Sequence, residues 1–310
     1  MPEHAVAPPR THAGLSGPTI AVIGVLGFSF KAILVKLAYA WASIDAVTLL
    51  ALRMLYAAPM FALMAWWAAK RGAARPIARR DWWMLAWLGF IGYYVSSLLD
   101  FMGLAYITAA LERLVLFLYP TMVVLLSSLL FKQRIDARKV LALVLSYAGI
   151  LLVFVHDLQF GDDPRALWIG GSMVFASAFC YSLYLVGAGP VISLLGSLRF
   201  IAWAMLISTA FVIGQFLATR PFAALAAPPR IQLLVLAMAV LSTALPTYLI
   251  AEAIKRMGAD RTSLVGSLGP VFTIALGYWI LGEPVFWIQI AGAALVLTGV
   301  TLVTLRRKSP

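Results

Sequence analysis

The chain has 310 residues, of which 63% are hydrophobic and only 12% are charged, and its formal net charge is +12. Soluble domains average about 45–50% apolar and about 25% charged residues, so this composition excludes an ordinary soluble domain and predicts a polytopic membrane protein. The basic excess does not indicate nucleic-acid binding, because the basic residues lie in short segments between long apolar blocks.

The chain begins with a polar segment and then becomes apolar. Residues 1–17 are rich in Pro, Gly and His, and we expect a disordered tail without a cleavable signal. A membrane span needs roughly 20 mostly apolar residues. The sequence predicts ten such spans, at residues 18–39, 44–69, 82–104, 109–131, 137–155, 166–187, 195–218, 231–254, 262–281 and 285–305. Their apolar runs are continuous, which favours transmembrane helices over a β-barrel.

The Lys and Arg residues between the spans predict an orientation. If the N-terminus is cytoplasmic, sixteen basic residues fall in cytoplasmic segments, and only Arg165, Arg220 and Arg230 fall outside. Cytoplasmic loops of membrane proteins carry the excess of Lys and Arg. We therefore expect an integral protein of the cell (inner) membrane whose two termini, including the basic tail 306–310, are cytoplasmic.

The first two predicted spans contain basic side chains within apolar sequence. At 1.5 Å per residue, Lys31 lies roughly 20 Å from the inner end of its span and Arg53 roughly 14 Å from the outer end of the next. An ionisable group at this depth is costly and indicates function or an internal ion pair. Lys31 and Arg53 are therefore candidates for substrate binding. Lys36, nearer the outside, either belongs to an outer gate or anchors the helix at the interface.

The third and fourth predicted spans add charges near the same outer side. Asp100 and Glu112 are candidates for proton coupling, because a carboxylate in a poorly hydrated site can exchange a proton as its surroundings change. Arg113, beside Glu112, is a candidate gate residue. The alternative is a static salt bridge, for example between Asp100 and Arg113, which would only hold helices together.

A shift of 150 positions reveals an internal repeat. The stretch LYPTMVVLLSSLLFKQRI (118–135) then lies over LGPVFTIALGYWILGEPV (268–285). A shift of 151 places GFSFKAILV (27–35) over AFCYSLYLV (178–186). The chain is thus predicted to contain two homologous halves of five helices each.

The predicted domain boundaries follow from this repeat. The halves cover residues 18–155 and 166–305, and the loop 156–165, expected in the periplasm, joins them. Because five is odd, the second half enters the membrane inverted relative to the first. Inverted repeats are typical of transporters, whose substrate site lies between the repeats near the bilayer centre.

The repeat also pairs two prolines. Pro120 coincides with Pro270, and each would interrupt its helix by removing one amide donor. The carbonyls freed in this way, those of Leu116 and Gly266, are tolerated at membrane depth only beside protein or a water-filled cavity. We expect two helix kinks that either border a central site or serve packing alone.

Aromatic residues within the spans complete the set of candidates. Trp and Tyr normally prefer the membrane interface, so those near mid-span are candidate lining residues of a substrate cavity. The alternative is that they contact lipid or the protein core. The candidates are Tyr94, Tyr119, Trp203, Tyr248 and Tyr278.

The end of the ninth span and the tenth span carry a family resemblance. The stretch LGPVFTIALGYWILGEPVFWIQIAGAALVLTGVTLV resembles the drug/metabolite transporter superfamily, specifically its ten-span type with two EamA-like repeats. A mid-helix proline, a Gly-Glu turn and a Gly-rich last span recur in that order. In the first half Gln133 stands opposite Glu283, where a glutamate is common. The resemblance implies gradient-linked movement of small metabolites, often export of amino acids.

These observations predict a secondary transporter and not an enzyme. The sequence contains no motif for hydrolytic, metal or nucleotide chemistry, so we expect no catalytic residue, metal or cofactor. The expected partners are a small-molecule substrate and membrane lipid. The main prediction is export of amino acids or similar solutes, with proton coupling as one option. The alternatives are uptake or exchange of an anionic or vitamin-like metabolite, and a non-transporting membrane protein.

Overall fold

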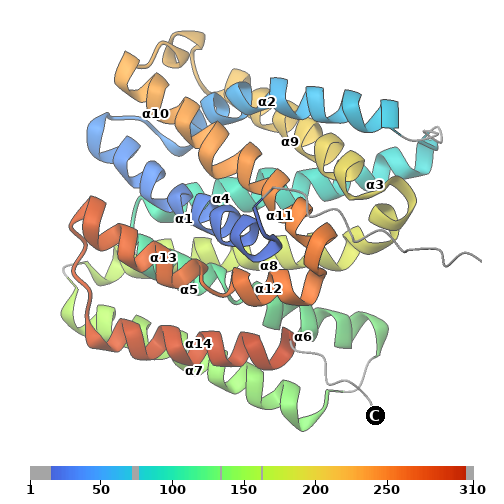
Figure 1. Cartoon of the computed structure of the whole chain (residues 1–310). Helices are drawn as coiled ribbons and strands as arrows, with labels where there is room; N and C mark the ends of the chain where they lie inside the picture. Colours follow the sequence, from blue (N-terminus) through green and yellow to red (C-terminus); the bar gives the residue numbers. More distant parts are fainter. Residues whose placement is uncertain (1–14, 72–76, 133–134, 162, 305–310) are drawn as a thin grey trace, which may run out of the picture.

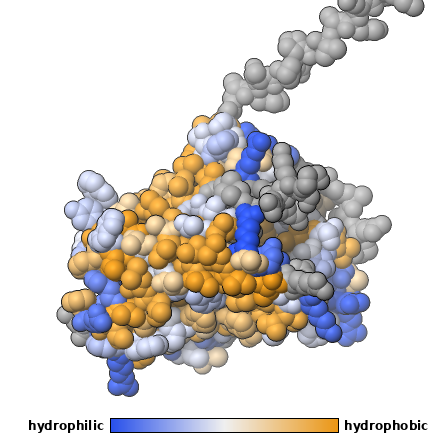
Figure 2. Space-filling model, turned by 90° about the horizontal axis from the view of Figure 1, so that it is seen from below, coloured by the Kyte–Doolittle hydropathy of each residue, from blue (hydrophilic) through white to orange (hydrophobic). Residues whose placement is uncertain are grey.

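The computed structural model describes residues 15–71, 77–132, 135–161 and 163–304, and every regular element within them is helical. Gln133, which the sequence comparison places opposite Glu283, lies outside the described residues. Much of the surface in Figure 2 is apolar, and hydrophilic residues gather mainly toward its two ends. An apolar belt between polar ends is the surface expected of a protein that spans a bilayer.

The first half begins with two long helices, α1 (Gly17–Trp41) and α2 (Ala46–Arg71). A second group follows, in which single spans are built from shorter pieces. These are α3 (Arg79–Gly89), the π-helical turn η1 (Phe90–Val95), α4 (Ser96–Leu104), α5 (Ala109–Leu116) and α6 (Tyr119–Phe131). The half ends with α7 (Ala137–Phe160). Thr108 and Asp136 cap α5 and α7 by accepting backbone N–H groups in the first turn.

The second half repeats this plan. It begins with α8 (Pro164–Leu195) and α9 (Ser197–Thr219), and the short 3₁₀ turn η2 (Phe222–Leu225) follows. The segmented spans are α10 (Pro229–Ala239), η3 (Val240–Ala244), α11 (Leu245–Met257), α12 (Ala259–Gly266), α13 (Gly269–Leu276) and η4 (Gly277–Leu281). The half ends with α14 (Trp287–Thr304).

The described residues contain eight helices that are long and apolar enough to cross a membrane. They match the first eight spans that the sequence predicts. At the two remaining positions the structure has shorter apolar helices, Gly269–Leu281 and Trp287–Leu302. Two non-helical residues, 267 and 268, separate α12 from α13 just before Pro270, at the same point of the repeat where residues 117 and 118 separate α5 from α6. The protein is a polytopic all-α protein, and its described residues form eight full-length spans and two shorter apolar helices.

The helix packing is symmetric between the two halves. In Figure 1, α7 and α14 lie side by side at the bottom, while α2, α9 and α10 form the top. Packing of α1 on α11 has its counterpart in packing of α8 on α4, and packing of α1 on α13 has its counterpart in packing of α8 on α6. Each half thus places its first helix against the broken helices of the other half.

The shift of 150 residues found in the sequence reappears in the backbone. The pair α5 and α12, and the pair α6 and α13–η4, have bounds that differ by 150. The π-helical turns η1 and η3 begin 150 residues apart, and both follow the same point in their spans. Left-handed residues end the two broken helices at Lys132 (φ 52°) and Gly282 (φ 67°). The two halves therefore share irregular as well as regular backbone.

The last helices of the two halves, α7 and α14, approach each other closely through glycines. A Cβ atom on Gly149 of α7 would lie 2.6 Å from the carbonyl oxygen of Gly292 of α14, and one on Gly292 would lie 2.7 Å from the Gly149 carbonyl. Small residues allow helices to approach within such distances in membranes. This contact explains the tight packing of α7 on α14 at one edge of the molecule.

Candidate functional site

Three ionisable side chains meet where α1, α4 and α5 pack together. Lys31 Nζ of α1 donates a hydrogen bond to Asp100 Oδ2 of α4 at 2.6 Å. The same nitrogen lies 3.3 Å from Glu112 Oε1 of α5. The three residues are named here the buried charge cluster. The sequence predicted each as a functional candidate, and the structure brings them together although they are far apart in the chain.

The cluster is almost completely removed from solvent. The side chains of Lys31, Asp100 and Glu112 are 16%, 3% and 0% exposed. Two carboxylates thus share one ammonium group. Among the described residues neither Glu112 oxygen accepts a hydrogen bond, and Asp100 Oδ1 accepts none. Since Glu112 meets Lys31 at ion-pair distance without hydrogen-bond alignment, it is the less well satisfied of the two acids.

Arg113 hydrogen-bonds to residues outside this cluster and joins the two halves. Its Nε donates to Thr273 Oγ1 of α13 at 2.9 Å, and its Nη2 donates to the Phe28 carbonyl of α1 at 2.6 Å. The suggested salt bridge between Asp100 and Arg113 is therefore absent from the described contacts, and Lys31 takes that position. Adjacent residues on a helix point about 100° apart, so Glu112 and Arg113 reach different neighbours.

Arg53 of α2 is also buried, with 5% of its surface exposed. Its Nη2 donates to Ser97 Oγ at 3.3 Å, and its guanidinium lies 4.8 Å from the centre of the Phe101 ring. Among the described residues Arg53 Nε has no hydrogen-bond acceptor. Arg53 thus adds an incompletely paired positive charge beside α4, the helix that carries Asp100.

A second ionic contact lies nearer the predicted outer face. Both carboxylate oxygens of Glu283 accept from the Ala109 amide at the start of α5, at 3.0 and 3.1 Å. Lys36 Nζ donates to the Ile107 carbonyl at 2.8 Å and lies 3.7 Å from Glu283 Oε1. A carboxylate at a helix N-terminus is favourable because it meets unpaired N–H groups and the positive end of the helix dipole. Glu283 and Lys36 therefore tie the second half to the first.

A group of tyrosines gathers where α8 packs on η1 and α6. The hydroxyls of Tyr93 and Tyr184 are 3.1 Å apart and share a hydrogen bond. Tyr181 stacks on Tyr184 and meets Tyr119 edge-on, with ring centres 5.5 and 5.3 Å apart. These four residues are named here the tyrosine cluster. Gly92 allows the close approach of Tyr184, since any Cβ at that position would overlap its ring.

Two serines make equivalent hydrogen bonds in the two halves of the internal repeat. Ser29 Oγ donates to the Gly269 carbonyl at 3.1 Å, directly before Pro270. Ser182 Oγ donates to the Tyr119 carbonyl at 3.1 Å, directly before Pro120. Both hydroxyls also donate to the carbonyl four residues back, at 2.9 and 2.7 Å. Each half thus supplies a hydroxyl to the backbone at the break in the other half's helix.

These serines correct the alignment of the first helices. The sequence pairs residues 27–35 with 178–186 at a shift of 151, whereas the serines correspond at a shift of 153. Lys31 and Tyr184, two residues further on, then occupy corresponding positions. At the shift of 150 that relates the broken helices, Asp100 corresponds to Ile250 and Glu112 to Thr262. The buried charge cluster therefore has a neutral counterpart.

The remaining aromatic candidates make their ring contacts outside both clusters or are largely exposed. Tyr94 packs with Phe90 and Phe211. Trp203 meets Trp82 edge-on at 4.9 Å and packs in the same hydrophobic core as the tyrosine cluster. Tyr248 is 41% exposed and Tyr278 is 55% exposed. Of the five aromatic candidates, Tyr119 belongs to the tyrosine cluster and Trp203 packs beside that cluster. Within the described residues no group of three or more His, Cys, Asp and Glu side chains could hold a metal ion.

Sequence reasoning missed four residues that shape this region. Tyr181, Tyr184, Ser29 and Ser182 stand in apolar stretches where hydroxyl-bearing residues attract no attention by themselves. A signal was available in the serines, since each lies in the first helix of its half at a nearly constant shift. Only the contact to the backbone before each proline shows that the two serines do the same thing.

Comparisons with known proteins place the chain among transporters. The EamA-like transporter family matches residues 15–155 and again residues 168–305. The protein named "Uncharacterized transporter YcbK" of Bacillus subtilis is 30% identical over 92% of each chain. "Uncharacterized transporter sll1319" of Synechocystis is 24% identical over 97% of this chain and 96% of its own. One solved crystal structure matches 92% of this chain with a TM-score of 0.63 at 18% identity, which supports the fold alone.

Proposed function

The chain belongs to the EamA-like transporter family, and from this premise we propose that it is a secondary transporter that exports small organic metabolites, foremost amino acids and similar zwitterions. The shorter apolar helices α13–η4 and α14 serve as the ninth and tenth spans in this proposal. Both termini are cytoplasmic and the protein resides in the inner membrane, because the basic residues gather in the segments that this orientation places inside.

The buried charge cluster is the observation that carries the proposal. It lies between α1, α4 and α5, and Arg113 of α5 contacts α13 of the other half. With the proposed orientation this region belongs to the outer half of the bundle. Separating a buried ion pair leaves charges without their partners and is costly, so in this proposal the cluster closes the outer route. Alternating access then consists of opening this side while the tyrosine cluster closes the inner one.

Proton coupling follows from the composition of the cluster. Glu112 lies in the cluster with Asp100 and has only the shared Lys31 at ion-pair distance. A proton taken up by Glu112 removes its attraction to Lys31 and leaves the pair between Lys31 and Asp100 balanced. Proton exchange at Glu112 would thereby loosen α5 from α1. Acids within membrane spans serve as proton relays in pumps and transporters.

A second substrate class is favoured by one specific observation. Arg53 Nε has no acceptor among the described residues, although the side chain is buried. An incompletely paired guanidinium suits a carboxylate or phosphate, which it can bind through two parallel hydrogen bonds. Uptake or exchange of an anionic or vitamin-like metabolite is therefore the alternative. Competition between anionic and zwitterionic ligands separates the two.

The test combines ligand screening with flux. Purified protein is screened by thermal shift against amino acids, vitamins and phosphorylated metabolites, because a ligand that binds the folded state raises its apparent stability. Each ligand found is then loaded into proteoliposomes, and its efflux is followed with and without a pH gradient. We expect a zwitterionic ligand whose gradient-dependent efflux is lost in Glu112→Gln. Gradient-dependent efflux that persists in this variant would contradict the role of Glu112, and absence of flux for every ligand found would contradict transport.

A further inference from the structure

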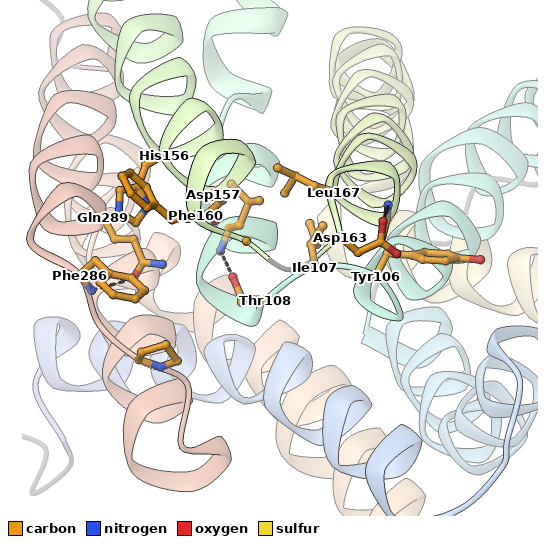
Figure 3. A pocket seen from close by; sticks show the side chains of 14 residues that line it. Tyr106, Ile107, Thr108, His156, Asp157, Phe160, Asp163, Leu167, Phe286 and Gln289 are labelled. Carbon is orange, nitrogen blue, oxygen red and sulfur yellow. Dashed lines mark hydrogen bonds and ion pairs between the residues drawn. The ribbon is translucent and has the colours of Figure 1, made fainter.

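A cavity of about 510 Å³ opens at the face where the connections 105–108 and 282–286 lie. Its wall is built from both halves, since the end of α7, the start of α8 and the start of α14 all contribute to it. Figure 3 shows His156, Phe286 and Gln289 on one side and Asp163 and Tyr106 on the other. This cavity is named here the vestibule. It is separate from the buried charge cluster, whose three members do not line it.

The vestibule is acidic although the protein as a whole is strongly basic. The described residues that line it include two aspartates, Asp157 and Asp163, and neither lysine nor arginine. Asp163 Oδ1 caps α8 by accepting from the Arg165 and Ala166 amides, both at 3.0 Å. Asp157 Oδ1 lies 3.1 Å from His156 Nδ1. Each aspartate is thus anchored through one oxygen, and within the described part of the chain its second oxygen accepts no hydrogen bond.

Aromatic rings lie beside these carboxylates. The His156 ring is 5.0 Å from the Phe160 ring and 5.1 Å from the Phe286 ring, measured between ring centres. Phe160 and Phe286 are 74% and 45% exposed, so their faces are available to a ligand. Aromatic faces attract cations, and a cation gains further from a carboxylate nearby. Rings and acids together suit an amine with an apolar body.

From this chemistry we propose that the vestibule binds small organic cations, specifically primary amines that carry an aromatic or apolar group. The ammonium group lies between Asp157 and Asp163, and the apolar group lies against Phe160 and Phe286. The volume agrees with the range of about 300–1,000 Å³ that is usual for small-molecule pockets.

The vestibule adjoins the contact that ties the halves together. Ile107 and Thr108 line it from the first half and Pro284 lines it from the second. Lys36 donates a hydrogen bond to the Ile107 carbonyl. Glu283, the neighbour of Pro284, accepts one from the amide of Ala109, the neighbour of Thr108. A bound amine would therefore lie beside Ile107, Thr108 and Pro284, which flank the contact of Glu283 with Lys36. It would not need to enter the buried charge cluster.

The experiment measures binding to the purified full-length protein in detergent by isothermal titration calorimetry. The probe is 2-phenylethylamine, and its matched anion is 3-phenylpropionate, which has the same ring and spacer. We expect the amine to bind at least about tenfold more tightly than the anion, which corresponds to about 1.4 kcal/mol. Equal affinity for both probes, or no binding of the amine, would overturn the proposal.

Variants locate the binding site. Asp157→Asn combined with Asp163→Asn keeps the shape of the wall, and Asn also retains the cap on α8. We expect this double variant to weaken amine binding by about tenfold. The matched control is Asp45→Asn, which removes a carboxylate in the connection 42–45, outside the vestibule, and should leave binding unchanged. Wild-type affinity in the double variant would exclude the vestibule as the site.

Two further variants test the location of the site independently of the double variant. Tyr106→Lys places a positive charge on the vestibule wall at a residue that is 48% exposed, so it should abolish amine binding even if the double variant folds poorly. Glu112→Gln should leave amine binding unchanged while it removes gradient-dependent transport. If Glu112→Gln weakens amine binding and Tyr106→Lys does not, the amine binds at the buried charge cluster and the vestibule proposal is wrong.

Discussion

The buried charge cluster and the tyrosine cluster are related through one position of the internal repeat, that of Lys31 and Tyr184, yet they differ in chemistry. Lys31 forms ionic contacts with two carboxylates, whereas Tyr184, its counterpart, shares a hydrogen bond with Tyr93 and stacks on another ring. Near both residues the helices have the same backbone breaks, and at each break a serine hydroxyl donates a hydrogen bond to the backbone. The two halves therefore share the backbone framework around this position and differ in its charge.

This difference makes the two sides of the bundle unequal in how they open. Separating Lys31 from its acids exposes or strands charges, which costs several kcal/mol unless protons or a ligand compensate. Separating Tyr93 from Tyr184 breaks one neutral hydrogen bond and some ring contact, which costs about 1 kcal/mol for the bond. Opening on the side of the buried charge cluster thus depends on protons or a charged ligand. Opening on the side of the tyrosine cluster depends on how the rings pack.

The largest effect is expected when the charge is removed from the cluster. Lys31→Met leaves Asp100 and Glu112 buried without their shared cation. Loss of one partner of a buried ion pair typically costs about 3–5 kcal/mol. We expect a large fall in the apparent melting temperature of the purified protein. Tryptophan fluorescence, or the fraction of protein that stays monodisperse on heating, measures this fall.

Two variants make this first prediction decisive. Lys31→Met combined with Asp100→Asn and Glu112→Gln removes the stranded charges and should recover most of the stability. The matched control is Lys36→Met on the same helix, where the side chain is 26% exposed and its acid partner lies 3.7 Å away. If Lys36→Met destabilises as much as Lys31→Met, burial of charge does not distinguish the cluster.

A smaller effect is expected on the tyrosine side. Tyr184→Phe removes the shared hydrogen bond with Tyr93 and keeps the ring contacts. The expected loss of stability is about 0.5–1.5 kcal/mol, the net value of a buried neutral hydrogen bond. The measurement is the same melting experiment, with Tyr94→Phe as control, because within the described residues Tyr94 makes ring contacts but no side-chain hydrogen bond. A loss comparable to that of Lys31→Met would remove the contrast between the two sides.

Much of the fold was predictable from sequence, for a simple reason. Apolar length determines which segments can span a bilayer, and the shift that superposes Pro120 on Pro270 also relates the helix breaks in the structure. The breaks before Pro120 and Pro270 were predicted only as kinks, since a proline shows where a helix is weakened and not how far the backbone departs from it.

The site was predictable only in part. Depth along a helix identified Lys31, Asp100 and Glu112 as candidates, but it gave no rotation about the helix axis. For that reason Asp100 was paired with Arg113 as an example, whereas its partner is Lys31. The aromatic candidates were chosen by depth alone, and of the five only Tyr119 belongs to the tyrosine cluster. Pairing in a helical bundle depends on which faces meet, and single-sequence patterns do not contain that information.

The smallest effect is expected at an exposed charge on the same face as the vestibule. Arg220 Nη2 of the second half lies 3.1 Å from Asp45 Oδ1 of the first, and the two side chains are 36% and 40% exposed. Partial burial acts to raise the pKa of the Asp45 carboxyl, but hydrogen bonds from Arg220 and Thr48 outweigh it and lower the pKa below its ordinary value of 3.8. A lowered pKa contributes stability above the ordinary value, and this contribution is lost as the pH falls through the folded-state pKa.

Asp45→Asn therefore tests whether burial, and not charge as such, sets the strength of the outer contacts. Asn keeps the contacts of Asp45 with the start of α2 but removes the charge. At pH 7 and low salt we expect a loss of less than about 1 kcal/mol, because solvent screens an exposed pair, and the loss should shrink as salt is added. The difference from wild type should also shrink as the pH falls from the ordinary pKa of 3.8 through the lower folded-state pKa, where the carboxyl becomes protonated. A salt-insensitive loss as large as that of Lys31→Met would mean that exposed and buried charge pairs contribute equally to stability, and burial would then not distinguish the buried charge cluster.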